Sequence, residues 1–298
     1  MKELVKDTTN RNLGFRHHKC RICDNEGEFQ SWLVREMMYG TKDEFEYFEC
    51  PGCKCMQISE VPKDLGNYYM TDYYSFSENK TDPESFPEIT RHESLLDVGC
   101  GTGKLLLELA FDGYGHLFGC DPFIESDIKY GDRIFIRKCE IKDIEGEKRF
   151  DIVNMGDSLE HVLDPIDTLK HVNRLLKDDG KAVISVPTWP NAAFDIFQTH
   201  WYQLDAPRHI FIPSKECMRY IADRAGLNVV NVLYNSGESQ FITSFFYEHN
   251  IPFVQLNNDV VMEYFSFEEI QDFRRITLMV NKEQNGDHMI VELRKRGE

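Results

Sequence analysis

Apolar and polar positions alternate along this chain in a way that predicts strands and helices in turn. From residue 94 onward, each short apolar run is followed by an amphipathic or polar stretch. The predicted strands are residues 94–98, 116–120, 134–137, 150–155, 181–186 and 227–234. Residues 276–281 and 289–294 predict a closing hairpin around Asn285-Gly286. The pattern indicates an α/β fold: a Rossmann-like, mostly parallel, seven-stranded sheet with helices on both faces.

Helix signals stand between these strands. Residues 104–112 form an amphipathic stretch directly after a glycine-rich turn. Asp164-Pro165 is a typical helix start, because proline is favoured in the first turn, and this helix is expected to reach about residue 177. Ser214 can cap a further helix that Gly226 would end.

Five of the nine cysteines lie before residue 56, and four of them form two C-x-x-C pairs. The pairs are Cys20 with Cys23 and Cys50 with Cys53. Zinc prefers four thiolates in a tetrahedron, and one C-x-x-C turn supplies two of them. Residues 29–35 and 44–48 alternate in polarity like the strands of a hairpin. We predict a zinc-ribbon lobe over residues 1–58 with a structural Zn²⁺; Cys55 is the alternative to Cys53 as fourth ligand.

The rest of the chain divides into a bridge and a larger domain. Residues 59–92 contain two tyrosine pairs, Tyr68-Tyr69 and Tyr73-Tyr74. These tyrosines either cover a ligand or pack the ribbon onto the main domain. Residues 93–298 form the main domain, with an insert near residues 236–272.

The composition bears on which partners the protein can bind and on the cellular compartment in which we expect it. The formal net charge is −17, which argues against a broad nucleic-acid surface because phosphate binding needs clustered Lys and Arg. Residues 1–22 are a local exception, with six bases and two acids. The N-terminus has no apolar core typical of a signal peptide, and no apolar run is long enough to span a bilayer. We therefore expect a cytoplasmic protein without membrane insertion, whose cysteines bind metal rather than form disulfides.

The most specific motif follows the first predicted strand of the main domain. Asp97 is followed by Gly99, Gly101 and Gly103, and a predicted helix begins at once. Glycine is needed where a backbone turns sharply or approaches a ligand closely. In a parallel sheet this turn lies at the carboxyl edge, where ligands bind.

This string resembles motif I of the class I S-adenosylmethionine-dependent methyltransferases. The resemblance extends over residues 15–298 and implies that the glycine turn cradles the amino-acid end of S-adenosylmethionine. It implies that Asp121, followed by Pro122, binds the ribose hydroxyls after the second strand. Glu140, or else Asp143, takes the place of the acid beside the adenine, although the family more often has Gly-Asp where this chain has Cys139-Glu140.

Two further segments resemble parts of the same family. The stretch Met155–Val162, followed by Asp164-Pro165, resembles the segment after the fourth strand, so Asp157 and Ser158 are expected between cofactor and acceptor. Residues 201–209, Trp-Tyr-Gln-Leu-Asp-Ala-Pro-Arg-His, resemble a stretch of methyltransferases of bacterial glycans and small molecules. There Asp205, Arg208 and His209 could bind an oxygen-rich acceptor, and Trp201 or Tyr202 could stack on its ring. The alternative is that these residues form a capping network between this loop and the next helix.

The sequence therefore predicts an enzyme that methylates a sugar, a nucleotide-linked sugar or another small oxygen-rich acceptor. An oxygen nucleophile benefits from a base with a pKa near the working pH, which histidine supplies. His209 is the first candidate and His161 the second. Two alternatives stay open: an RNA methyltransferase that grips RNA through its zinc ribbon and basic N-terminus, and a binding module without catalytic activity.

Overall fold

The computed structural model describes residues 5–9, 11–69 and 86–297. The chain forms two compact units, each built from more than one segment. Unit 1 comprises Met1–Tyr68, Pro187–Met218 and Val232–Ile290, and the remaining residues form unit 2. The predicted pair Tyr73-Tyr74 lies outside the described residues. The domain bounds predicted from the sequence stay a prediction.

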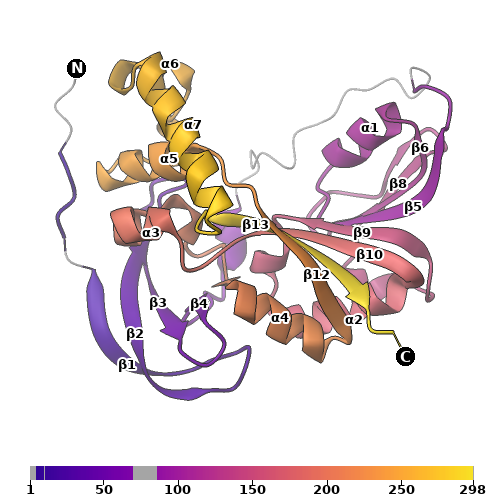
Figure 1. The fold of residues 1–298 in the computed structure, drawn as a ribbon, viewed down its shortest axis with the longest axis horizontal. Coiled ribbons are helices and arrows are strands. Elements are labelled where there is room, and N and C mark those ends of the chain that lie inside the picture. The colour runs from indigo at the N-terminus through magenta and orange to yellow at the C-terminus, as the bar shows by residue number, and fades with distance from the viewer. Residues whose placement is uncertain (1–4, 10, 70–85, 298) are drawn as a thin grey trace. The chain divides into compact units, whose positions relative to one another are not determined.

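A five-stranded sheet forms the N-terminal part of unit 1 (Figure 1). Its strand order is β1-β2-β3-β4-β11. The strands are β1 (Asn12–Lys19), β2 (Glu26–Arg35), β3 (Glu44–Cys50), β4 (Cys55–Ile58) and β11 (Phe211–Ile212). All four neighbouring pairs are antiparallel, as predicted for a ribbon hairpin at β2 and β3.

Pairing of β11 with β4 extends the ribbon sheet with a late segment of the chain. Phe211 pairs with Gln57 and Ile212 with Met56. An apolar cluster lies beside this junction and includes Trp32, Trp189 and Trp201, which are all buried. The ribbon strands therefore share one core with residues 187–218 and do not form an isolated lobe within unit 1.

Helices form most of the later part of unit 1. They are α3 (Ala192–Phe197), α5 (Ser239–Glu248), α6 (Asn258–Tyr264) and α7 (Phe267–Lys282), with the 3₁₀ turns η1 (Leu65–Tyr68), η6 (Gln198–His200), η7 (Tyr202–Leu204) and η8 (Phe253–Gln255). The apolar cluster of Ile242, Phe246 and Phe265 joins α5 to the start of α7.

The predicted hairpin around Asn285-Gly286 is wrong in its first half. Residues 276–281 lie inside the helix α7, not in a strand. Ser266 and Glu269 form a capping box that fixes the start of this helix, and Ile270 and Phe273 pack on the α5 cluster at helical spacing. These contacts outweigh the β-like run of apolar residues that follows.

Unit 2 is built on an eight-stranded sheet with the order β12-β13-β10-β9-β5-β6-β8-β7. The strands are β5 (Arg91–Val98), β6 (Tyr114–Cys120), β7 (Ile128–Tyr130), β8 (Ile134–Arg137), β9 (Phe150–Gly156), β10 (Leu176–Pro187), β12 (Leu227–Tyr234) and β13 (His288–Lys295), of which the last two are counted partly with unit 1. Strands β10, β9, β5, β6 and β8 are parallel, and β7 is antiparallel to β8. The prediction of seven strands missed the short edge strand β7.

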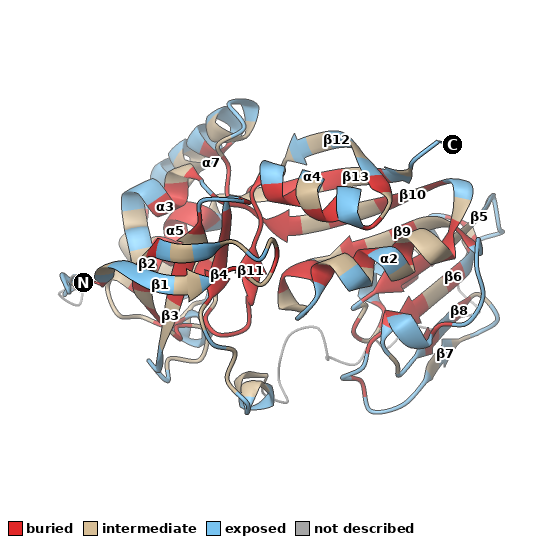
Figure 2. Ribbon diagram, turned by 90° about the horizontal axis from the view of Figure 1, so that it is seen from below, coloured by how far each residue is buried: buried red, intermediate tan, exposed pale blue. Residues whose placement is uncertain are grey.

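Helices cover both faces of this sheet, as predicted. The helices are α1 (Lys104–Phe111), α2 (Pro165–Leu175) and α4 (Lys215–Arg224), with the 3₁₀ turns η4 (Ile141–Asp143) and η5 (Leu159–His161). Helix α1 lies on one face and α2 on the other (Figure 1). The central strands are largely buried (Figure 2). No helix in the described ranges is long and apolar enough to cross a membrane.

Candidate active site and metal centre

The glycine turn after β5 has a backbone that other residues would not fit. Gly99, Gly101 and Gly103 take φ angles of 74°, 52° and 86°. A Cβ on Gly103 would lie 2.4 Å from Cδ1 of Ile136, and one on Gly99 would lie 2.7 Å from Cβ of Ser158. Helix α1 begins directly after this turn. The N–H groups of Gly99 and Gly103 donate to the carbonyl oxygens of Cys120 and Cys100. The turn therefore presents a tightly folded backbone without side chains at the carboxyl edge of the sheet, where a ligand can approach closely.

Asp97 stands at the end of β5 and is almost completely buried. Its Oδ1 accepts a hydrogen bond of 2.8 Å from Nδ2 of Asn154 on β9. Burial raises the pKa of Asp97 from 3.8 to about 7; the hydrogen bond from Asn154 opposes this shift, and the negative charge of Asp121 adds to it. Sequence reasoning missed Asn154, although a polar residue inside an apolar strand was a usable signal.

Asp121 connects the second strand end to the glycine turn. Its Oδ2 accepts a 2.9 Å hydrogen bond from the N–H of Gly101, and its Oδ1 accepts one of 2.8 Å from the N–H of Phe123. Burial raises the pKa of Asp121, and these two hydrogen bonds oppose the shift. Each carboxylate oxygen keeps a second lone pair that can accept from a hydroxyl group.

The remaining predicted cofactor residues lie along the same edge of unit 2 and are exposed. Pro122 follows Asp121 directly, and Asp157 follows β9 with a φ of 47°. Glu140 forms a capping box with Asp143 at η4, and its Oε2 lies 2.7 Å from Nζ of Lys142. The observed role of Glu140 is a turn cap, so its contact with adenine stays a prediction.

His161, the second candidate base, belongs to unit 2 and follows β9 in the turn η5. Its Nδ1 lies 3.0 Å from the hydroxyl of Tyr69. His209, the first candidate base, belongs to unit 1. The structure thus places the two candidates in different compact units.

His209 is buried and its tautomer follows from its partner. Nδ1 lies 2.7 Å from the carbonyl oxygen of Gln203, which can only accept, so Nδ1 carries the proton. Nε2 then holds a lone pair, and it lies 3.8 Å from Oδ2 of Asp205. This arrangement suits a base, because the carboxylate stabilises the imidazolium that forms when Nε2 takes up a proton.

Arg208 holds the backbone of this loop in place. Its side chain is fully buried, and it donates to both oxygens of Asp205, to Oε1 of Glu36 at 3.1 Å and to the carbonyl oxygen of Tyr68 at 3.0 Å. The carboxylate of Glu36 also accepts from three successive backbone N–H groups of residues 39–41. The expectation that Arg208 binds the acceptor is therefore wrong. Sequence reasoning gave no role to Glu36.

Trp201 is likewise part of the core. It is fully buried, and its Nε1 donates to Oδ2 of Asp287 at 3.0 Å. It cannot stack on an acceptor ring as expected. Tyr202 is half-buried, and its hydroxyl lies 3.3 Å from Oγ of Ser239.

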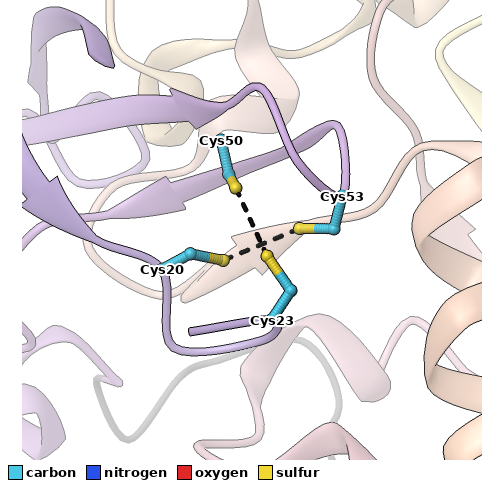
Figure 3. A group of neighbouring side chains, drawn as sticks. All are labelled: Cys20, Cys23, Cys50 and Cys53. Atoms are coloured by element: carbon cyan, nitrogen blue, oxygen red, sulfur yellow. Dashed lines mark hydrogen bonds between the residues drawn. The ribbon is translucent and has the colours of Figure 1, made fainter. Parts of the chain in front are cut away.

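The four predicted metal ligands come together in unit 1. Cys20, Cys23, Cys50 and Cys53 point their sulfur atoms toward a common centre (Figure 3), and all four sulfurs lie within 4.8 Å of one another. The Cys20–Cys53 and Cys23–Cys50 sulfur distances are 3.6 Å and 3.5 Å. A tetrahedron with bonds of 2.3 Å has edges of about 3.8 Å, so the spacing fits a tetrathiolate zinc site and not a disulfide.

Polar donors around the sulfurs fit thiolates. Nε2 of the buried Gln57 donates to Sγ of Cys20 at 3.1 Å. Arg21 fixes the orientation of this amide, because its Nε and backbone N–H both donate to Oε1 of Gln57. Nδ2 of Asn25 lies 3.9 Å from Sγ of Cys50. Such donors stabilise the negative charge that four thiolates leave around a divalent cation.

The described bases of the N-terminal stretch are held by contacts within unit 1. Each of the five bases among the described residues 5–22 has a partner. The ion pairs are Lys6–Glu248, Arg11–Asp7, Arg11–Glu44, Arg16–Glu46 and Lys19–Asp24, and Arg21 donates to Gln57 and to the carbonyl oxygen of Ile58. Among these residues there is no row of unpaired cations that would bind a phosphate backbone.

Comparison with known families agrees with the site in unit 2. A family model described as "Methyltransferase domain" matches residues 73–232, which is more than half of the chain. The chain belongs to this methyltransferase family. The matched range includes the glycine turn, Asp97 at the end of β5, and the acids that follow β6 and β9.

The individual relatives share about a third of their residues with this chain over the aligned parts. The chain is 30% identical over 144 residues to the ubiquinone biosynthesis O-methyltransferase of Bradyrhizobium diazoefficiens, which covers 43% of this chain and 56% of that protein. It is 31% identical over 116 residues to the demethylmenaquinone methyltransferase of Staphylococcus carnosus, covering 35% and 48%. The chain thus spans about half the length of these curated relatives. A crystal structure of geranyl diphosphate C-methyltransferase from Streptomyces coelicolor has a TM-score of 0.47 and 15% identity, covering 72% of this chain and 76% of that chain.

Proposed function

We propose that this protein uses S-adenosylmethionine to methylate an oxygen atom of a small organic acceptor. The observation that carries the proposal is the pair of buried acids, Asp97 and Asp121, beside the glycine turn. Burial raises the pKa values of both acids. S-adenosylmethionine brings an ammonium group, a sulfonium and two ribose hydroxyls, which such a pair would bind. Membership of the methyltransferase family supports the same function.

Different residues would bind different parts of S-adenosylmethionine. Asp97 would pair with the ammonium end, Asp121 would accept from the ribose hydroxyls, and the turn at Gly99 and Gly101 would admit the ligand close to the backbone. When bound, the cofactor supplies an electrophilic methyl group. The protein then has to hold the acceptor oxygen in line with that group in a water-poor pocket.

We propose that Nε2 of His209 takes up the proton that the acceptor hydroxyl loses when it is methylated. The hydrogen bond to Gln203 leaves this nitrogen unprotonated, and Asp205 would stabilise the charge that it gains. His161 is the alternative base. A non-catalytic binding module is not favoured, because the glycines and both acids of the cofactor motif are intact.

The proposed acceptor is a small oxygen-rich molecule, such as a sugar or a nucleotide-linked sugar. The resemblance of residues 201–209 to methyltransferases of glycans and small molecules supports this class. The names of the two curated relatives, a ubiquinone biosynthesis O-methyltransferase and a demethylmenaquinone methyltransferase, add quinones as a second class. RNA is not favoured, because four described N-terminal bases are paired with acids and the net charge is −17.

Transfer of a radiolabelled methyl group tests the acceptor class. Equal amounts of nucleotide-linked sugars, hydroxylated quinols and RNA would be offered to the purified protein with labelled S-adenosylmethionine. We expect label in a small-molecule product. Label in RNA, or no transfer to any small molecule while the cofactor is bound, would overturn the assignment of acceptor.

The raised pKa of Asp97 predicts that cofactor binding depends on pH. The ammonium group pairs only with the ionised carboxylate, and about a tenth of a group with a pKa of about 7 is ionised at pH 6. We expect S-adenosylmethionine to bind about tenfold more weakly at pH 6 than at pH 8. Isothermal titration at the two pH values measures this, and Asp97→Asn, which cannot ionise, should bind weakly with little dependence on pH.

Without ligand, the same group makes stability depend on pH in the opposite direction. The folded chain holds the proton of Asp97 more tightly than the unfolded chain, whose pKa is near 3.8. The contribution of Asp97 to the free energy of unfolding is therefore largest below about pH 4 and is lost as pH rises to about 7.

The affinity measurement has one outcome that contradicts this placement of Asp97. If the parent protein binds S-adenosylmethionine equally well at pH 6 and pH 8, Asp97 does not belong to the cofactor site.

We also propose that Cys20, Cys23, Cys50 and Cys53 hold one structural Zn²⁺. Four thiolates complete a tetrahedral shell and leave no position for a reacting water, so the metal would stabilise unit 1 and take no part in methyl transfer. Cys55 lies next to the group and is fully buried, with its Sγ donating to the carbonyl oxygen of Met56. We therefore keep Cys53 as the fourth ligand.

A further inference from the structure

Tyr69, from the bridge before the matched family range, contacts residues that follow two different strands of unit 2. Its ring stacks on Phe123, with centroids 5.8 Å apart and planes 12° from parallel. Its hydroxyl lies 3.0 Å from Nδ1 of His161, whose ring meets it edge-on at 6.0 Å. All three residues belong to unit 2.

The order of the strands shows that the contacts of Tyr69 lie on both sides of the glycine turn. Phe123 follows β6, and His161 follows β9. Strand β5 runs between these two strands and parallel to both. Its carboxyl end carries the glycine turn, so a side chain that touches both flanking segments spans that turn.

The contact with Phe123 leads directly to the proposed ribose acid. The backbone N–H of Phe123 donates to Oδ1 of Asp121 at 2.8 Å, while Oδ2 accepts from Gly101. With Tyr69 stacked on it, the Phe123 side chain is still 65% exposed, so part of its ring stays accessible to a ligand. One chain of contacts therefore joins the glycine turn, Asp121, Phe123, Tyr69 and His161.

We propose that Tyr69 is a positioning residue that closes the cofactor pocket, an inference that rests on the proposed use of S-adenosylmethionine. The stacked Tyr69–Phe123 pair covers the nucleoside end of the bound ligand. The hydroxyl of Tyr69 anchors this cover on His161, and a phenol can donate to or accept from Nδ1, so the anchor holds for either tautomer. The cover slows release of the ligand and fixes the imidazole ring beside the pocket.

Two substitutions separate the contribution of the Tyr69 ring to cofactor binding from that of its hydroxyl group. Tyr69→Phe keeps the stacking and loses the anchor, so we expect its affinity for S-adenosylmethionine to fall about 2- to 10-fold. Tyr69→Ala loses both, and we expect a fall of about 10- to 100-fold. The loss should appear in the dissociation rate of labelled S-adenosylmethionine and in KM for the cofactor, with kcat at saturating cofactor within about threefold of the parent.

Tyr114→Phe is the matched control. The hydroxyl of Tyr114 accepts from Arg91 at the amino end of β6, away from the carboxyl edge, so its loss should leave cofactor binding unchanged. The double variant Tyr69→Ala with Phe123→Ala should lose less affinity than the sum of the two single losses, because both belong to one stacked pair.

The outcomes distinguish this inference from the proposed function. If the parent protein does not bind S-adenosylmethionine, the proposed function fails and this inference fails with it. If the parent binds and a folded Tyr69→Ala releases the cofactor at the parent's rate, only the cover is refuted. If Tyr69→Ala does not fold, an unchanged dissociation rate in Tyr69→Phe refutes the anchor on His161.

Discussion

The His209→Asn variant is expected to bind S-adenosylmethionine as the parent does and to turn over about 10²- to 10⁴-fold more slowly. The amide nitrogen of asparagine can replace Nδ1 as donor to the carbonyl of Gln203, so the loop keeps its main hydrogen bond. What is lost is Nε2, the proposed acceptor of the proton. The rate profile of the parent should show an ionisation near neutrality that the variant lacks.

His161→Asn is the matched comparison for this experiment. A large loss of turnover in His161→Asn with little in His209→Asn would reverse the assignment of the base. If His209 only caps its loop, His209→Asn should instead melt at a lower temperature and keep most of its turnover. Small losses in both variants would point to an acceptor that needs no side-chain base.

Loss of the metal ligands is the second change with a large expected effect. The purified protein should contain about one zinc per chain, and Cys20→Ser or Cys50→Ser should lose it. Binding of structural zinc contributes on the order of 10 kcal/mol in small metal-dependent folds, so we expect the melting temperature to fall by at least about 10 °C. Metal analysis and thermal melting measure the two effects.

Cys139→Ser is the control for the zinc experiment. Cys139 is a half-buried free thiol of unit 2 and is not among the grouped sulfurs. It should keep both the zinc and the melting temperature of the parent. Full retention of zinc in the Cys20/Cys23 double serine variant would rule out the tetrathiolate site.

Much of the fold was predictable because its signals are local in sequence. The strands β8 and β12 were predicted at the bounds observed, and the helix start predicted at Asp164-Pro165 is confirmed by α2. The cap predicted at Ser214 is confirmed as well, because its Oγ accepts from the N–H of Cys217. The α7 segment was mispredicted, because a β-like run of apolar residues was judged without the capping box ten residues before it.

The sequence predicted those parts of the candidate site whose residues lie close together in the chain. The glycine turn and Asp97 lie within seven successive residues, and the two C-x-x-C turns carry their metal geometry in their spacing. The pairing of Arg208 with Glu36 could not be predicted, because the two residues are 172 positions apart in the sequence. Asn154 and Gln57 also act through contacts with distant segments, on Asp97 and on Cys20.

Calorimetric titration with S-adenosylmethionine tests the central claim most directly. We expect the parent protein to bind one molecule per chain and Asp121→Ala to bind about 10- to 100-fold more weakly, because a charge-assisted hydrogen bond contributes about 1.5–3 kcal/mol. Asp132→Ala, which removes a fully exposed acid of the same unit, should bind as the parent does. The absence of binding to the parent, or an unchanged affinity in Asp121→Ala, would contradict the account.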